Sequence, residues 1–384
     1  MEYFKDVIRP ILDQLPSEPM HHIVRDSLSL IEQNPILLRG LEAAVFSGGY
    51  RFKSSKLRNF YRGQLRENTT QLGAGWDKPG KAQLAWHTLG CGSTVVGGIT
   101  PEFQPGNPDR PRQHVFKDTD GKYGIINFFG LNSDGRFAVA ENLEKYHSRK
   151  YPIIASVAYN SGTEMKNIPN DFVYVINSLY TSVDGYQLLI SCPNVHGAEI
   201  VHKLHDPAFL KDTAQAVVEA QERTGGRMPT DIKTGGDVTI SELNELIRVC
   251  SDFDFGIVGI NTSGNEDFKA AFRKRGVKGG FSGDYNPYRQ RALEVAAYVY
   301  NETTGQVPFT ASGAIYTGED AWRRHLAGST INEIMSAPRI YGLGAADKIN
   351  RYIDEKLKSC FLSEIIGIEA QNYANISYPH IPRE

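Results

Sequence analysis

The chain has 384 residues, of which 40% are hydrophobic and 22% are charged, and its formal net charge is −2. This composition excludes a disordered or fibrous chain, and so small a charge gives no strong field to attract nucleic acid. No apolar run approaches the roughly 18 residues that a transmembrane helix needs. Charges near the start of the chain argue against a signal peptide, and four widely spaced cysteines without a C-x-x-C pair indicate a reducing compartment. A cytoplasmic protein is therefore expected.

Two amphipathic helices are predicted before the main part of the chain. Apolar residues recur at steps of three and four near the start, which predicts a helix over residues 2–15. A second apolar stripe between Met20 and Ile31 predicts another helix, which Asn34 and Pro35 would end.

These two helices would form a helical hairpin over residues 1–50, in front of a domain formed by residues 51–384. The hairpin has two open interpretations. It either caps the domain by packing against it, or it lies on a membrane surface and admits a lipophilic substrate, since short helices with one apolar face bind bilayer interfaces.

From residue 70 onward, eight short apolar runs alternate with eight helix-like segments. The predicted strands cover residues 72–75, 93–100, 153–158, 186–192, 230–234, 255–262, 307–315 and 329–336. The predicted helices cover residues 81–89, 136–148, 171–183, 208–223, 240–250, 288–301, 319–326 and 345–357. Apolar strands that are each followed by a helix indicate a parallel sheet in the α/β class, and eight of them favour a closed (β/α)8 TIM barrel over an open sheet. Residues 99–136 are predicted to be a long loop, and the tail after residue 362 is expected to wrap the barrel.

Chemistry in such a barrel lies at the carboxyl ends of the strands, where several unusual residues fall. After the first strand, Ala74 and Gly75 allow a flat ligand to approach the backbone, and Lys78 would project over it. Cys192 ends the fourth strand, and its thiol, with a typical pKa of about 8.5, is suited to act as a general base. Lys233 ends the fifth strand, where a buried cation requires an anionic partner.

The later strands end in polar or glycine-rich segments. Asn261 and Thr262 supply hydrogen-bonding groups after the sixth strand, and a glycine-rich turn with Gly283 follows them. Gly313 and Ala314 follow the seventh strand and lead into a helix, an arrangement typical of phosphate binding in these barrels. Neither a complete G-x-G-x-x-G nor a G-x-x-x-x-G-K-[ST] motif is present, which disfavours nicotinamide cofactors and nucleoside triphosphates.

Two further clusters are interpreted without a ligand. His196, His202 and His205 follow the fourth strand, but only two carboxylates accompany them, so we expect a solvated loop and no metal site. The basic and aromatic stretch over residues 50–66 is interpreted as a solvated surface and not as a site for nucleic acid.

Seven motifs follow one another along the chain. None of them is specific for one family by itself, but their order and spacing together are. They are GAGWDKPG, GGITPEFQPGNPDRPR, INFFGLNSDG, ISCPNVHG, INTS, KGGFSG and ASGAIYTGEDA. Together they resemble the dihydroorotate dehydrogenase family of FMN-dependent (β/α)8 barrels, from the hairpin to about residue 360. The hairpin is similar to that of the membrane-associated, quinone-reducing class, whose base is serine, whereas Cys192 resembles the base of the soluble class.

The resemblance implies an FMN cofactor and a place in pyrimidine biosynthesis. It makes Cys192 and Lys78 catalytic: Cys192 removes a proton from dihydroorotate or a related cyclic amide while hydride passes from the adjacent carbon to flavin N5. It assigns substrate binding to Lys78, Asn127, Asn194, Asn261 and Thr262. It assigns FMN binding to Ala74, Gly75, Lys78, Gly98, Ser156, Lys233, Thr262, Gly283, Gly313, Ala314, Met335 and Ser336.

Four features depart from the family pattern. Leu189 replaces a substrate-binding asparagine, and Ala314 replaces the second glycine of the phosphate turn. Met335 and Ser336 replace a Tyr-Thr pair, and Ser156 replaces an asparagine that meets the flavin. The leucine removes a hydrogen bond that is worth about 1–3 kcal/mol when its partner stays buried.

Because of these departures, two other functions remain possible interpretations of the sequence. A flavin-dependent desaturase or ene-reductase for a non-orotate substrate is indicated by Leu189, and a flavin-free barrel with a binding or lyase-type role is indicated by the altered phosphate turn. The resemblance of the hairpin to the quinone-reducing class favours a quinone as the electron acceptor, whereas the resemblance of Cys192 to the soluble class favours a soluble acceptor. In the first case the hairpin would contact the inner face of a membrane. The partners are otherwise small molecules, and the oligomeric state is open.

Overall fold

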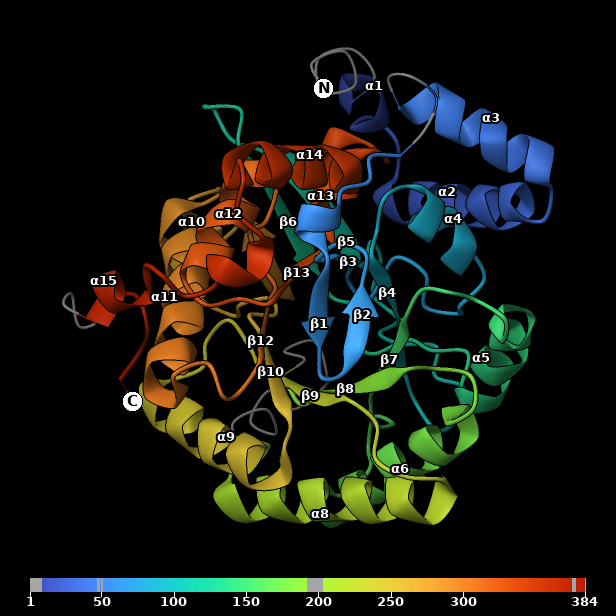
Figure 1. Ribbon diagram of the computed structural model, residues 1–384. Coiled ribbons are helices and arrows are strands. Elements are labelled where there is room, and N and C mark those ends of the chain that lie inside the picture. The colour runs from blue at the N-terminus through green and yellow to red at the C-terminus, as the bar shows by residue number, and fades with distance from the viewer. Residues whose placement is uncertain (1–8, 47–48, 50, 192–202, 375–377, 384) are drawn as a thin grey trace.

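The computed structural model describes residues 9–46, 49, 51–191, 203–374 and 378–383. Eight parallel strands close into a barrel in the order β10-β12-β13-β3-β4-β7-β8-β9, which confirms the predicted (β/α)8 architecture (Figure 1). The strands are β3 (Thr70–Leu72), β4 (Ser93–Ile99), β7 (Ile153–Val157), β8 (Gly185–Leu189), β9 (Thr230–Lys233), β10 (Gly256–Gly259), β12 (Phe309–Ala311) and β13 (Ile331–Ile334). Each falls within or beside one of the predicted runs, because the strands are buried on both faces and most of them are rich in apolar residues.

Helices surround the barrel and cover its outer face (Figure 1). They are α4 (Gln83–Thr88), α5 (Arg136–Leu143), α6 (Ile168–Leu179), α8 (Pro207–Thr224), α9 (Ile240–Phe253), α11 (Asn286–Thr303), α12 (Gly318–Leu326) and α14 (Ala345–Leu357). Their inward stripes are buried, as with Val175 and Ile176 of α6, and this packing between helices and strands forms the core. Three short helices, α10 (Glu266–Ala270), α13 (Ser336–Tyr341) and α15 (Ala370–Ala374), were not predicted.

The tail lies along α11, as expected. Asn301 donates hydrogen bonds to the Ala370 carbonyl (2.8 Å) and to the Tyr378 hydroxyl (2.7 Å), and Arg291 donates to the His380 carbonyl (2.7 Å).

The predicted long loop over residues 99–136 contains structure of its own. Strands β5 (Gln113–Lys117) and β6 (Tyr123–Asn127) form an antiparallel hairpin, and β11 (Gly280–Gly283) extends it to a three-stranded sheet. The register pairs Asn127 with both Gln113 and Gly280. Proline and charged residues around the hairpin concealed these strands from the sequence pattern, and their pairing brings Asn127 to the mouth of the barrel.

The N-terminal hairpin differs from its prediction. Within the described residues, the first predicted helix is reduced to α1 (Arg9–Leu12), and α2 (Ser17–Glu32) is followed by an unpredicted helix, α3 (Pro35–Val45). The Asn34 side chain accepts hydrogen bonds from the backbone of Ile36 (2.9 Å) and Leu37 (3.3 Å), so it begins α3. An asparagine followed by proline is favourable at a helix start as well as after a helix end, and the sequence was interpreted only in the second way.

A small antiparallel hairpin packs at the amino-terminal end of the barrel strands. It consists of β1 (Asn59–Tyr61) and β2 (Gln64–Arg66), and the hydroxyl of Tyr61 donates a 2.8 Å hydrogen bond to the buried carboxylate of Asp231 on β9.

We expect Asp231 to make the free energy of unfolding fall as the pH rises from about 4 to about 6. Burial raises the pKa of its carboxyl from 3.8 to about 6. Between these values the folded state holds a proton that the unfolded state has released, so raising the pH costs up to about 3 kcal/mol of stability. Urea unfolding at about pH 4.5 and pH 7 tests this. The free energy of unfolding of Asp231→Asn minus that of wild type should be larger at pH 7 than at pH 4.5. An equal difference at both pH values would contradict it.

Candidate active site

A large cavity opens at the carboxyl ends of the barrel strands. It encloses about 1180 Å³ when the open solvent at its mouth is included. The barrel strands and their following loops supply most of the lining. The three-stranded sheet adds Gln113, Ile125, Asn127 and Ser282, and α2 adds His21.

Most of the predicted site residues line this one cavity. They are Ala74, Gly75, Lys78, Gly98, Asn127, Ser156, Lys233, Asn261, Thr262, Gly313, Ala314, Met335 and Ser336. Gly283 does not line it. Ser282 does instead, because successive residues of a strand face opposite sides, and a Cβ on Gly283 would meet the ring of Phe281. Cys192 and Asn194 lie outside the described residues, as do His196 and His202.

The loop that carries Lys78 is held from beneath by Asp77. The carboxylate of Asp77 is fully buried and accepts hydrogen bonds from the backbone of Lys81 (2.9 Å) and Ala82 (2.7 Å) and from the side chain of Gln83 (2.6 Å). These contacts fix the start of α4 and the turn before it. The aspartate in the W-D-K-P-G motif is therefore the residue that holds this loop in shape.

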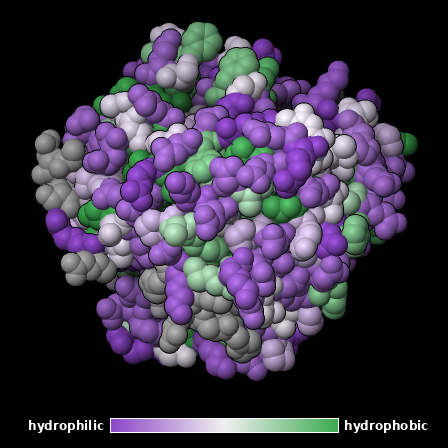
Figure 2. Space-filling model, turned by 90° about the horizontal axis from the view of Figure 1, so that it is seen from below, coloured by the Kyte–Doolittle hydropathy of each residue, from purple (hydrophilic) through white to green (hydrophobic). Residues whose placement is uncertain are grey.

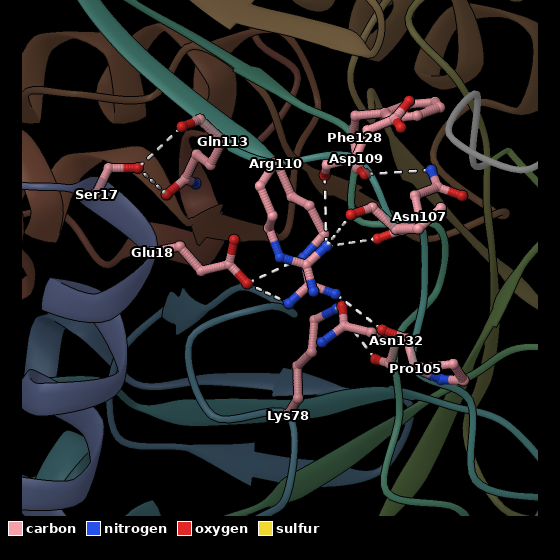
Figure 3. A network of polar contacts seen from close by, with 12 residues as sticks. Ser17, Glu18, Lys78, Pro105, Asn107, Asp109, Arg110, Gln113, Phe128 and Asn132 are labelled. Atoms are coloured by element: carbon pink, nitrogen blue, oxygen red, sulfur yellow. Dashed lines mark hydrogen bonds and ion pairs between the residues drawn. The ribbon is translucent and has the colours of Figure 1, made fainter.

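Lys78 itself reaches across to the opposite loop (Figure 3). Its Nζ donates to the carbonyl (3.2 Å) and to the side-chain oxygen of Asn132, and it lies 5.0 Å from the centre of the Phe129 ring. Its cationic end is thus placed at the cavity and between two loops.

The hairpin helix α2 closes one side of the mouth. His21 stacks on Trp76 with ring centres 4.8 Å apart, and Trp76 donates a 2.6 Å hydrogen bond to the Met335 carbonyl. Desolvation by burial, aided by the positive charge of Arg339, lowers the pKa of His21 to about 3, so its imidazole is neutral near pH 7. No sequence signal marked His21, because its partners lie far along the chain.

Polar contacts attach α2 to the three-stranded sheet (Figure 3). The Ser17 hydroxyl donates to the carbonyl (3.1 Å) and side chain (3.2 Å) of Gln113, and Glu18 forms an ion pair with Arg112. Arg112 also lies 5.3 Å from the centre of the Phe129 ring, the same ring that Lys78 covers. The hairpin, the sheet and the Lys78 loop therefore form one connected rim.

Asn261 lies at the end of β10 beside the chain segment that leads to Cys192. Its amide nitrogen donates to the Ser191 hydroxyl (3.5 Å), its oxygen accepts from the Thr262 backbone (2.9 Å), and Ser191 donates to the Lys233 carbonyl (2.8 Å). The residue just before Cys192 is thus held between two residues that line the cavity. Of the histidines beyond it, His205 is buried and hydrogen-bonds Thr234 (3.0 Å).

The floor of the cavity is polar and buried. Lys233 forms an ion pair with Glu333 of β13, which is the anionic partner that the sequence required. Ser156 is also buried, and its hydroxyl has no hydrogen-bond partner among the described residues. Since buried hydroxyls are normally paired, this atom fits a ligand with hydrogen-bonding groups at its edge. Leu189 lies nearby and presents an apolar side chain to the cavity.

A tight turn follows β12 at another part of the lining. Gly313 and Ala314 both have left-handed backbone angles, with φ of 84° and 53°. A Cβ on Gly313 would lie 2.8 Å from the Ile260 carbonyl oxygen and from the Tyr288 hydroxyl, so only glycine fits there. Met335 and Ser336, after the neighbouring strand β13, complete this part of the cavity.

Comparisons with known proteins agree with this geometry. The family model described as "Dihydroorotate dehydrogenase" matches residues 59–357. Dihydroorotate dehydrogenase (quinone) from Deinococcus radiodurans is 28% identical over 372 residues, covering 95% of this chain and 99% of the relative. The protein of the same name from Roseiflexus sp. is also 28% identical and covers 94% and 97%.

Among solved structures, DHODH from Eimeria tenella in complex with ferulenol has a TM-score of 0.77 at 23% identity, covering 91% of this chain and 95% of that chain. At this identity the likeness establishes the shared fold alone. The family match extends over most of the sequence, including all eight barrel strands and the loops that line the cavity. The chain therefore belongs to the dihydroorotate dehydrogenase family.

Proposed function

We propose that this chain is an FMN-dependent enzyme that oxidises dihydroorotate or a closely related cyclic amide and passes the electrons to a quinone. Family membership makes it an oxidoreductase that acts on a CH–CH bond. The observation that carries the finer assignment is that Lys78, Asn127, Asn261 and Lys233, from four separate parts of the chain, line one cavity.

The cavity suits a flavin at its floor. Ala74, Gly75 and Gly98 leave room against the backbone. The Ser156 hydroxyl, which has no partner in the described part of the chain, and the cation of Lys233 match the polar edge of an isoalloxazine ring. The glycine-rich turn after β12, together with Met335 and Ser336, would hold the phosphate. When bound, FMN supplies the hydride acceptor that no amino acid side chain provides.

The protein's own residues would hold the substrate and move its proton. Asn127 and Asn261 would bind the amide and carboxylate edges of the ring, and Lys78 would balance the carboxylate charge. Cys192, which follows the segment fixed by Ser191, would take the proton. Proton removal by a positioned base is worth about 10²–10⁴-fold in rate.

The hairpin supports a quinone as acceptor. Curated relatives are named as quinone-dependent enzymes, and α2 contributes His21 to the cavity, so a lipophilic molecule that enters beside α2 would reach the site. Several large apolar side chains on or beside the hairpin helices are exposed, and they would contact a membrane surface. They are Ile11, Leu15, Ile23, Leu30, Ile36 and Leu37.

Other parts of the surface differ from the hairpin in character. The face seen from below in Figure 2 is mostly hydrophilic, with apolar residues in small scattered groups. Over the described part of the chain, no helix has the length and apolar character needed to cross a bilayer. A peripheral contact through the apolar side chains of the hairpin helices would bring the site to the membrane.

An anaerobic titration of the purified protein with dihydroorotate tests the proposal. Bleaching of the flavin absorbance in proportion to added substrate, followed by recovery on addition of a short-chain quinone, is the expected result. A yellow protein that dihydroorotate does not bleach would contradict the substrate, and Leu189 would then mark a different one. A colourless protein that takes up no FMN would overturn the proposal.

A further inference from the structure

The ion pair at the cavity floor is almost completely buried. Glu333 lies in the middle of β13, between Asn332 and Ile334, and Lys233 is the last residue of β9. The exposed fractions of the two side chains are 2% and 7%, yet both line the cavity. Burying a charge costs free energy unless the charge is paired and hydrogen-bonded, so the partners of Glu333 show what stabilises it there.

Every polar contact of the Glu333 carboxylate comes from a donor. Lys233 and the Ser312 hydroxyl (3.4 Å) donate to Oε1, while the side chains of Gln71 (3.2 Å) and Gln187 (2.9 Å) donate to Oε2. These residues come from four separate strands or strand ends around the barrel. A carboxylate that accepts from four donors is held in one orientation.

The surroundings are shaped for this carboxylate. Gln71 is itself oriented by the Ser93 hydroxyl, which donates to its side-chain oxygen (2.8 Å). Gly73 leaves space for the acid, because a Cβ there would lie 3.1 Å from Glu333 Cγ. Glu333 therefore cannot swing away from Lys233 without breaking contacts with β3 and β8.

We propose that Glu333 is a positioning residue that fixes the Lys233 ammonium and offsets its charge toward the bound flavin. The inference rests on the FMN site proposed above. A lone buried cation would strongly favour negative charge in the cavity, and reduction of a flavin adds negative charge to its ring. The carboxylate next to Lys233 weakens that preference. It thereby lowers the reduction potential of the flavin and favours electron release to the acceptor.

Replacement of the acid by its neutral isostere tests this directly. In Glu333→Gln, the reduced flavin should bind about tenfold more tightly relative to the oxidised form. This corresponds to a rise of about 30 mV in the two-electron midpoint potential. The control is Glu32→Gln, which breaks another ion pair of a buried glutamate, with Lys145 (2.8 Å), outside the cavity lining. Its potential should equal that of wild type.

A second variant avoids leaving Lys233 without a counter-charge, in case Glu333→Gln does not fold. The double variant Lys233→Met/Glu333→Gln removes both charges. Its preference for reduced over oxidised flavin should differ from that of wild type by less than about threefold, so its midpoint potential should lie within about 15 mV of the wild-type value. An unchanged midpoint potential in Glu333→Gln, or a fall of about 30 mV or more in the double variant, would contradict the proposal that Glu333 offsets the charge of Lys233 toward the flavin. Wild-type protein that binds no FMN is a different result, and it would overturn the proposed function together with this inference.

Discussion

Cys192→Ala is expected to slow reduction of the bound flavin by dihydroorotate at least about 100-fold while the flavin stays bound. A thiol with a pKa of about 8.5 is a useful base near neutral pH, and its loss removes the group that takes the proton. The neighbouring Ser191 is held by Asn261 and by the Lys233 carbonyl, and both of these residues line the cavity, so the residue directly before Cys192 is fixed next to the proposed substrate site.

Anaerobic stopped-flow absorbance measures this rate. Cys192→Ser should retain part of it, with a pH profile displaced to higher pH because a hydroxyl is a weaker acid than a thiol. The control is Cys360→Ala, which removes an exposed cysteine and should reduce flavin at the wild-type rate. A wild-type rate in Cys192→Ala would exclude Cys192 from the proton transfer.

The barrel could be predicted from sequence because its signal is periodic. Short apolar runs at regular intervals require burial on both faces, and eight of them leave few architectures. The prediction of the N-terminal hairpin was wrong at Asn34 and Pro35, because this pair is compatible both with a helix end and with a helix start. Asn34 and Pro35 end one helix and begin the next, and only the contacts of the Asn34 side chain with α3 show the second role.

The cavity could be predicted in outline by the same logic, since strand ends in a closed barrel meet on one rim. His21 could not, because nothing in α2 indicates which of its faces meets Trp76. Glu333 carried a signal that was available, because it is a charged residue inside the predicted strand over residues 329–336. Lys233 was expected to need an anion, and the two together point to a pair across the barrel.

Asp77→Ala should produce the largest loss of stability of the changes considered, about 4 kcal/mol in the free energy of unfolding. The substitution leaves the amides of Lys81 and Ala82 and the side chain of Gln83 without their acceptor in a buried site. Hydrogen bonds to a charged group contribute about 1.5–3 kcal/mol each, and their losses do not add fully because the three donors share one carboxylate.

The same change should also impair the site, because Lys78 follows Asp77 directly. Affinity for FMN is expected to fall at least about tenfold, measured by flavin fluorescence. Urea unfolding gives the stability, and Asp77→Asn, which keeps one acceptor oxygen, should lose about half as much. The matched control is Asp118→Ala. Its carboxylate also accepts from two backbone amides, of Asp120 (3.0 Å) and Lys122 (2.7 Å), but in a surface turn where water replaces them. It should cost less than about 1 kcal/mol and leave FMN binding intact. Equal losses in the two alanine variants would mean that burial of the Asp77 carboxylate does not set the shape of the Lys78 loop.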